Sequence, residues 1–332
     1  MSNPNLGWLF YKELYRKGND PDHIKNTLAK MQEVSAPHPQ KEKLANFGFT
    51  LTTTYPGLLI GSGYTHGISS DDDVKTGFYF DHTTGLPQIP GSSVKGVLRS
   101  FFKLLEDEDQ EALVIAFFEE IFQEAGISET INKTFLQNLE KEIFDGKNPQ
   151  TDKPLPIYQR DKFFDAVVVK VGKDGLLSED YITPHKEPLK NPIPIKILKV
   201  APKVSFAFAF DLKDGTLSAA QKELLFLKLL LFSGVGAKTN VGYGQFEEWS
   251  EEAFEKMKQK HKRDILKNLE SDYEKLMTKL KEGIIKNAKS IHDAIKKIEK
   301  LEDKEKEELK KLIDEIIADK GGKWYKKIEK LL

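Results

Sequence analysis

A long apolar segment runs directly into a glycine-rich stretch, LLLFSGVGAKTNVGYGQFEEW, between Leu229 and Trp249. An apolar run of this kind predicts a buried helix, and the glycines after it end the helix at once. The stretch then takes on the pattern of a strand. Four glycines enclose a single lysine, and they are Gly234, Gly236, Gly242 and Gly244. The chain must therefore form a helix, a glycine-rich loop and a strand in succession.

This loop does not match a nucleotide-binding P-loop. That motif needs a glycine directly before its lysine, but Ala237 precedes Lys238, and no glycine lies at the required upstream position. A helix also comes first here, whereas a P-loop follows a strand. Another polyanion remains possible, because successive N–H groups can point into one concavity and Lys238 adds a charge. The alternative is a turn that only lets a helix meet a strand.

A second candidate for binding a polyanion is the segment IPGSSVKGVLRS, where a Pro-Gly turn opens a predicted helix. The first turn of a helix has unpaired N–H donors and partial positive charge, which suit a phosphate oxygen. Two cations four residues apart share one helix face. The residues concerned are Gly91, Ser92, Ser93, Lys95 and Arg99. The alternative is a helix capped by one of the serines, with two ordinary surface cations.

Apolar periodicity along the main body predicts the order strand, helix, strand, strand, helix, strand. The segments start with a strand from residue 47 and continue through 92–106, 162–172, 195–212, 217–232 and 242–249. This order predicts an α+β fold of the ferredoxin-like type (βαββαβ, RRM-like), in which two helices cover one face of a four-stranded antiparallel sheet. The open face of such a sheet is a common platform for RNA.

Three regions are expected along the chain. Residues 1–40 form an N-terminal helical region, residues 41–250 the ferredoxin-like domain with added helices at 107–144, and residues 251–332 a helical extension rich in Lys and Glu. Residues 260–300 predict a long amphipathic helix or a helical hairpin, bent near Gly283, and a second such piece runs on to residue 332. The charges of the extension indicate a solvated face, or alternatively a docking surface for protein or RNA.

Composition points to a cytoplasmic protein. The chain has no cysteine, a hydrophobic content of 39% and a charged content of 31%. Its start does not resemble a signal peptide, and its longest apolar run is too short to cross a membrane. The formal net charge of −1 does not by itself indicate a nucleic-acid binder. A local track of cations can still bind phosphates within a neutral chain.

Catalytic patterns are weak in this sequence. The seven histidines lack the spacing of metal ligands, so we expect no metal site. Asp71, Asp72 and Asp73 lie in a predicted loop and could hold Mg²⁺ for phosphodiester cleavage, although such a cluster is more often a plain acidic loop. No cofactor is expected unless this loop is catalytic. Tyr243 could stack on a base, although an aromatic residue entering a strand more often belongs to the core.

The two glycine-containing segments together resemble the RAMP superfamily of CRISPR-associated RNA-binding proteins. Three further segments, NLGWLFYKELY, FFDAVVV and DYITPHKEPLKNPIPIKILKVAP, narrow the resemblance to a subunit family of the type III-B (Cmr) effector. The likeness covers residues 5–250 and leaves out the helical extension. By position, the residues that match the two family motifs are Gly91, Ser92, Ser93, Lys95, Gly234, Gly236, Lys238, Thr239, Gly242, Tyr243 and Gly244.

The resemblance implies a backbone subunit that holds guide RNA and complementary target RNA near the 3′ end of the guide, beside other RAMP subunits. It also places a thumb-like insertion between Gly172 and Pro194. Related subunits cut RNA with an aspartate in the loop before the first helix, and Asp73 is the nearest equivalent here, with its role open. The alternatives are therefore a non-catalytic RNA scaffold, a ribonuclease subunit, and an interaction module acting through its helical tail.

Overall fold

The structure, a computed structural model of the chain, describes residues 5–18, 20–32, 45–61, 78–125, 127, 129–182, 194–247, 250, 252–253, 255–260, 272–281, 283–296, 298, 303–317 and 322–332. The chain divides into two compact units, Met1–Glu248 and Trp249–Leu332. Each unit buries apolar side chains of its own. Among the described residues, no helix is long and apolar enough to cross a membrane.

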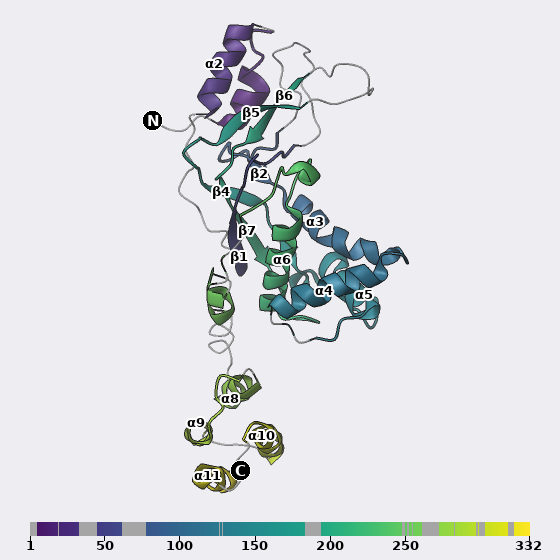
Figure 1. The fold of residues 1–332 in the computed structure, drawn as a ribbon, viewed down its shortest axis with the longest axis vertical. Coiled ribbons are helices and arrows are strands. Elements are labelled where there is room, and N and C mark those ends of the chain that lie inside the picture. Colours follow the sequence, from purple (N-terminus) through teal and green to yellow (C-terminus); the bar gives the residue numbers. More distant parts are fainter. Residues whose placement is uncertain are drawn as a thin grey trace. The chain divides into compact units, whose positions relative to one another are not determined.

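The larger unit is built on a five-stranded antiparallel sheet of order β1-β7-β4-β2, with β3 also paired to β7 (Figure 1). Its strands are β1 (Phe47–Thr52), β2 (Gln88–Ile89), β3 (Lys162–Phe163), β4 (Ala166–Lys170) and β7 (Ser205–Asp211). Antiparallel strands joined by long helices confirm the expected α+β class. The register pairs Phe49 with Phe208 and Leu51 with Phe206.

Alternating apolar residues direct one face of this sheet into the core. Phe206, Phe208 and Phe210 of β7 are buried, as are Phe49 and Leu51 of β1. Side chains two residues apart in a strand point to the same face, so these five rings and chains form one layer. Two long helices lie on that side of the sheet, α3 (Gly91–Lys103) and α6 (Ala219–Ser233) (Figure 1).

The opposite face of β1 and β7 carries small residues. Gly48 and Thr50 of β1 are exposed, and Ala207 and Ala209 of β7 are partly exposed. No aromatic residue of these two strands points to this face, because their phenylalanines occupy the alternate positions whose side chains point to the buried side. Stacking of bases on sheet aromatics, as in an RRM, therefore has no platform on β1 and β7.

The strand expected over residues 242–249 is much shorter than predicted. Its described part forms a single antiparallel bridge between Thr53 and Phe246. Two backbone hydrogen bonds extend this contact, from Thr54 N–H to the Gln245 carbonyl at 3.0 Å and from Glu247 N–H to the Thr52 carbonyl at 2.8 Å. Residues 242–244, which come before this contact, form turns and so do not pair with β1. Periodicity indicated the position of this edge segment but overestimated its length.

Added helices extend the larger unit beyond α3, as expected for residues 107–144. They are η2 (Leu104–Glu106), α4 (Glu111–Ala125), α5 (Lys133–Glu140) and η3 (Lys141–Asp145), followed by the single turn η4 (Ile157–Gln159). Phenylalanine rings join them to α3, since Phe102 lies 4.8 Å from Phe118 and 5.4 Å from Phe144 between ring centroids. These helices therefore share one core with α3.

A second layer lies at the other end of this unit. It contains α1 (Leu6–Trp8), η1 (Leu9–Glu13), α2 (Pro21–Gln32) and the hairpin of β5 (Leu177–Ile182) with β6 (Ile195–Val200). The buried ring of Phe10 contacts Phe78 and Phe80 at 6.0 and 5.7 Å, which fixes the N-terminal helices on the body. Helix α2 packs against β5.

The smaller unit contains several short helices in place of one long helix, and the chain bends at Gly283 as the sequence predicts. These helices include α8 (Asp272–Lys281), α9 (Ala288–Ile295), α10 (Asp303–Ile316) and α11 (Lys323–Glu329). The chain turns after α8 at Gly283, whose φ of 65° few other residues adopt easily. Leu276, Leu280 and Ile291, which follow the apolar spacing of an amphipathic helix, meet Ile313 of α10 in one buried cluster.

One lysine of α6 is enclosed in the larger unit. Lys222 is 1% exposed, and its Nζ lies 2.9 Å from Glu142 Oε1 and 2.8 Å from Asp161 Oδ2. Burial acts to raise the pKa of Glu142, but Lys222 and Thr216 hold it below its ordinary value. Burial raises the pKa of Asp161 above its ordinary value despite the same lysine. This cluster joins α6 to η3 and to the residues before β3.

We expect Lys222→Met to lower the free energy of unfolding by about 3–5 kcal/mol, because two buried carboxylates would lose their cation. In the wild-type chain the lowered pKa of Glu142 gives a stabilising contribution that is present at neutral pH and is lost as the pH falls through that pKa. In the variant the pKa values of both carboxyls rise. The difference in stability between the two proteins should therefore narrow on acidification, as measured by urea denaturation at neutral and mildly acidic pH.

The matched control is Lys228→Met on the same helix. Lys228 pairs with Glu124 near the surface, where its side chain is 26% exposed and that of Glu124 is 49% exposed. Such a pair contributes about 1 kcal/mol or less. Similar losses in both variants would contradict a dominant role for the buried cation.

Candidate nucleic-acid interface

The two ends of the glycine-rich loop touch each other through their backbones. Val235 N–H donates to the Gly244 carbonyl at 2.9 Å. A Cβ atom at Gly244 would lie 1.8 Å from the Val235 carbonyl oxygen, and the residue has a φ of 70°. Both facts restrict the position to glycine. The loop is therefore a closed, ordered structure.

Neighbouring backbone fixes the loop from a second side. Ala237 N–H donates to the Leu59 carbonyl at 2.9 Å, and Gly244 N–H donates to the Gly57 carbonyl at 2.8 Å. A Cβ at Gly236 would lie 2.3 Å from the Leu59 carbonyl oxygen. Several loop N–H groups are thus used within the protein. Gly234, Gly242 and Gly244 donate their N–H groups to the Leu230, Thr239 and Gly57 carbonyls, so Gly236 alone of the four glycines keeps a free N–H among the described residues.

The middle of the loop is exposed. Lys238 has a φ of 60° and precedes the turn η5 (Thr239–Val241), which Gly242 closes by donating to the Thr239 carbonyl at 3.1 Å. Within the described part of the chain, the N–H groups of Gly236, Lys238, Thr239 and Asn240 donate to no protein acceptor. Lys238 likewise has no carboxylate within ion-pair distance among those residues. The tip therefore combines free amide donors with an uncompensated cation.

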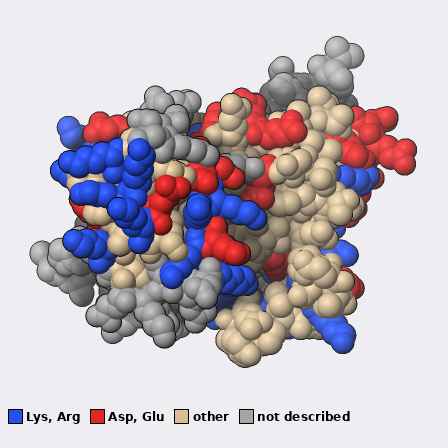
Figure 2. All heavy atoms as spheres, turned by 90° about the horizontal axis from the view of Figure 1, so that it is seen from below, with Lys and Arg blue, Asp and Glu red and all other residues tan. Residues whose placement is uncertain are grey.

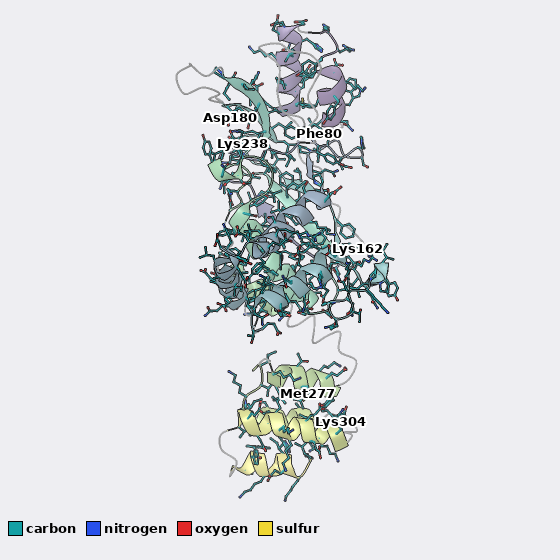
Figure 3. The ribbon with its side chains drawn as sticks, turned by 90° about the vertical axis from the view of Figure 1, so that its right-hand side faces the viewer. Phe80, Lys162, Asp180, Lys238, Met277 and Lys304 are labelled. Atoms are coloured by element: carbon teal, nitrogen blue, oxygen red, sulfur yellow. The ribbon has the colours of Figure 1, made fainter. Side chains whose placement is uncertain are left out.

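Tyr243 lies in the core, as the alternative interpretation held. Its ring is 7% exposed and packs with Leu59 and Ile197, so it offers no face to a base. Its hydroxyl donates to Asp180 Oδ2 at 2.8 Å, and Lys199 donates to the same carboxylate. Burial and the Asp180 hydrogen bond raise the pKa of Tyr243 to about 12. Tyr243 thus fastens the loop to the β5–β6 hairpin; Figure 3 shows Lys238 and Asp180 at the same end of the larger unit.

Tyr55 is an exposed aromatic residue beside the loop that sequence reasoning missed. Its side chain is 83% exposed, and Lys199 Nζ lies 5.9 Å from the ring centroid. The next residue, Pro56, lies under the loop, where a Cβ at Gly242 would meet its Cδ at 3.4 Å. A tyrosine before a proline in a turn carries no sequence signal that separates it from core aromatics. Its exposure becomes visible only once the loop and the turn are placed together.

The N-terminus of α3 differs from the expected phosphate site. Gly91 is buried, and its N–H donates to Asp165 Oδ1 at 2.7 Å, so a carboxylate already occupies the positive end of the helix. Ser92 and Ser93 are exposed in the first turn, and neither caps the helix, because Pro90 holds the cap position. Both serines remain available to a ligand, but the N–H group of Gly91 at the start of the helix already donates to Asp165.

The two cations of α3 have different surroundings. Lys95 is partly exposed, with its Nζ 5.8 Å from the Phe163 ring centroid. Arg99 is engaged by carboxylates of the added helices: its Nε lies 2.9 Å from Glu140 and its guanidinium 2.9 Å from Asp145. Burial acts to lower the pKa of Arg99, but these two carboxylates raise it. Arg99 therefore joins α3 to α5 and η3 and is not a free cation.

The glycine-rich loop and the start of α3 lie at different levels of the sheet. A Cβ at Gly91 would meet the Phe163 carbonyl oxygen at 2.2 Å, and Phe163 pairs with Phe210, whose partner in β1 is Phe47 at the start of that strand. The loop instead bonds to Gly57 and Leu59, which follow the end of β1.

Predicted site residues remain exposed or partly exposed on both segments: Gly236, Lys238, Thr239 and Gly242 on the loop, and Ser92, Ser93, Lys95 and Arg99 on α3. Asp73 falls outside the described residues, as does part of the segment between Gly172 and Pro194. Among the described residues, no group of three or more His, Asp or Glu side chains could hold a metal ion.

Two curated proteins are similar to this chain in sequence. The chain is 29% identical to the CRISPR system Cmr6 subunit of Saccharolobus solfataricus over 218 residues, which cover 62% of this chain and 61% of that protein. It is also 29% identical to the Cmr6 subunit of Pyrococcus furiosus over 222 residues, covering 55% of this chain and 64% of that protein. The chain thus spans a little under two thirds of the length of these curated relatives.

Two solved structures show a weaker likeness. One is a cryo-electron microscopy structure of the type III-B Cmr-beta bound to cognate target RNA. The match covers 61% of this chain and 58% of the chain in that structure, at 25% identity and a TM-score of 0.40. The other is the crystal structure of Cmr6 from Pyrococcus furiosus. The match covers 63% of this chain and the whole chain of that structure, at 22% identity and a TM-score of 0.39.

A family match covers the glycine-rich loop, α3, α6 and the strands of the sheet except for the first three residues of β1. A family model for the RAMP superfamily matches residues 50–247, which is more than half of the chain. The helical unit after Glu248 lies outside this match. On this match the chain belongs to the RAMP superfamily.

Proposed function

We propose that this chain is an RNA-binding backbone subunit of a type III-B CRISPR effector, in the place that Cmr6 takes in its own complex. There it would hold guide RNA and the guide–target duplex near the 3′ end of the guide, beside other RAMP subunits, in defence against invading nucleic acid. The similarity to two Cmr6 subunits supports the type of complex. The position on the guide rests on the family resemblance.

The exposed tip of the glycine-rich loop carries this proposal. Lys238 and the N–H groups of Gly236, Thr239 and Asn240 have no partner within the described residues, so their hydrogen bonds are free for an external acceptor. Amide donors in consecutive turns and one cation fit phosphate oxygens. Such contacts read no bases, so the subunit would hold RNA of any sequence.

We further propose that the sheet is a ferredoxin-like one with a reduced edge strand. The Thr53–Phe246 bridge places the segment after α6 next to β1, on the side away from β7. The order is then final segment, β1, β7, β4, with α3 and α6 as the two connecting helices. In this order the loop after α6 lies beyond the end of β1, where a passing RNA strand could touch its exposed tip.

We expect Lys238→Ala to weaken binding of the full chain to single-stranded RNA about tenfold, because one charge-assisted phosphate contact is lost. The loss should be similar for unrelated sequences, and the slope of affinity against salt should fall by about 0.7. Fluorescence anisotropy with two unrelated RNA oligonucleotides at several salt concentrations measures both quantities.

Lys162→Ala is the control for this change. It removes the same charge, but Lys162 pairs with Asp211 at 2.7 Å and lies far from Lys238 (Figure 3). Its RNA affinity should equal that of the wild-type chain. If Lys238→Ala also leaves affinity and salt slope unchanged, the loop tip does not hold RNA.

A second expectation concerns Arg99, which the sequence placed among the RNA-binding residues. We expect Arg99→Ala to lower the free energy of unfolding by about 1–2 kcal/mol, because Glu140 and Asp145 lose a shared partner. RNA affinity should stay within about twofold of wild type. A large drop in affinity with unchanged urea denaturation would show instead that Arg99 meets the RNA.

A further inference from the structure

The helical extension contains a packed pair of helices with a defined outer surface. Helices α9 and α11 lie against each other and bury Ile291, Ile295 and Ile328 between them. Tyr325 of α11 is also buried, and its hydroxyl donates to Asp314 of α10. This bond fixes the rotation of α11 and uses the Asp314 carboxylate within the unit. The packing therefore decides which side chains of α9 and α11 face the surface of this unit.

Cations surround an indole ring on this surface. Lys327 Nζ lies 4.6 Å and Lys289 Nζ 5.9 Å from the ring centroid of Trp324. The ring of His292 lies 5.2 Å from the same ring, between centroids. Trp324 is partly exposed, while Lys289 and Lys327 are exposed. We call these four residues, contributed by two helices, the Trp324 cluster.

The positive charge of this surface is not neutralised locally. Within the described residues, neither Lys289 nor Lys327 has a carboxylate within ion-pair distance, and His292 contacts Asp293 at 3.1 Å. Further exposed lysines extend the surface along α11, at Lys323, Lys326 and Lys330. Figure 2, seen from below the view of Figure 1, shows Lys and Arg side chains gathered on one side of this face, with Asp and Glu side chains among them.

Charge is also divided unequally between the two units. The unit Trp249–Leu332 has 23 Lys and Arg against 19 Asp and Glu, whereas Met1–Glu248 has 28 against 33. The nearly neutral whole chain therefore combines an acidic body with a basic extension. A polyanion would be attracted to the extension first.

The chemistry of the cluster favours one class of polyanion. A protein interface needs an apolar centre with a polar rim, and a membrane surface site needs a strip of apolar side chains. In the described part of this unit, the large hydrophobic residues that are well exposed are Ile284 and Leu331, at 47% and 36%. An isolated indole among ammonium groups instead fits a single nucleic-acid strand, whose bases stack while its phosphates meet the cations.

We propose that the Trp324 cluster is a second RNA-binding site, specific for single strands and independent of sequence. It lies outside the region shared with the RAMP superfamily. It therefore adds an RNA contact that the shared domain does not contain. The site does not depend on the glycine-rich loop, and either can exist without the other.

The test uses the full-length chain and an RNA oligonucleotide of about 20 nucleotides. We expect the double variant Lys289→Ala/Lys327→Ala to bind about tenfold more weakly, with a salt slope reduced by about 1.4, since each cation contributes about 0.7 on a single strand. Duplex RNA of the same length should show a smaller loss, because its bases are not free to stack.

The matched control is Lys256→Ala/Lys258→Ala. It removes two charges from the same unit, but these lysines pair with Glu252 and Glu255. Its affinity should equal that of the wild-type chain. Equal affinities of the two double variants would overturn the proposal. Circular dichroism of both proteins shows whether they remain folded.

Ultraviolet crosslinking provides a second readout that does not depend on any variant. With a photoreactive base in the single strand, we expect a crosslinked peptide that contains Trp324. Crosslinks confined to Met1–Glu248 would overturn the proposal. A membrane site would give a different result: the Lys289→Ala/Lys327→Ala variant would lose binding to vesicles of anionic lipid that the wild-type chain binds, and the RNA affinity of the variant would equal that of the wild type. That result would also overturn the proposal.

The two RNA sites are separated by combining the variants. If Lys238→Ala has no effect but the Lys289/Lys327 variant does, the proposal for the loop fails and this one stands. If only Lys238→Ala weakens binding, this one fails and the loop stands. If both act, their effects on the logarithm of affinity should add when the sites are independent.

Discussion

The contact between the two ends of the glycine-rich loop positions the rest of the proposed interface. Gly244 meets Val235 so closely that no side chain fits between them, and the same loop bonds to Gly57 and Leu59. Leu58 in turn exchanges backbone hydrogen bonds with Val200 at the end of β6. One set of backbone contacts thus joins α6, the segment after β1 and the β5–β6 hairpin. The tip around Lys238 projects from this frame, because the residues on either side of it are bonded to neighbouring backbone.

This frame divides the loop into two parts with different roles. Its buried residues satisfy one another, and Tyr243 ties them to Asp180 on the hairpin. Its exposed residues keep donors that the protein does not use. A binding surface made this way can offer amide groups to phosphates without any rearrangement, because the ordering cost is met during folding. Exposed Tyr55 adds an aromatic face at the edge of the same surface.

The two units differ in charge and in the reach of the family match. The RAMP region carries the loop, α3 and an acidic excess, while the extension carries a basic excess and the Trp324 cluster. Because the larger unit has few free cations, a second RNA contact elsewhere in the chain would raise the affinity of the whole chain for RNA. Two separated sites on one strand raise the effective affinity of each, provided that the RNA can reach both.

Sequence alone determined the α+β class, the apolar alternation of the strands, the amphipathic pattern of the extension and the presence of a glycine-rich loop after a buried helix. These follow from local periodicity and from backbone conformations open mainly to glycine. Only the tertiary structure decided which cations are free: Arg99 meets Glu140 and Asp145, whereas Lys238 meets no described carboxylate. It also decided that Tyr243 is buried and Tyr55 exposed. Such differences arise from partners distant in the chain, and no local pattern encodes them.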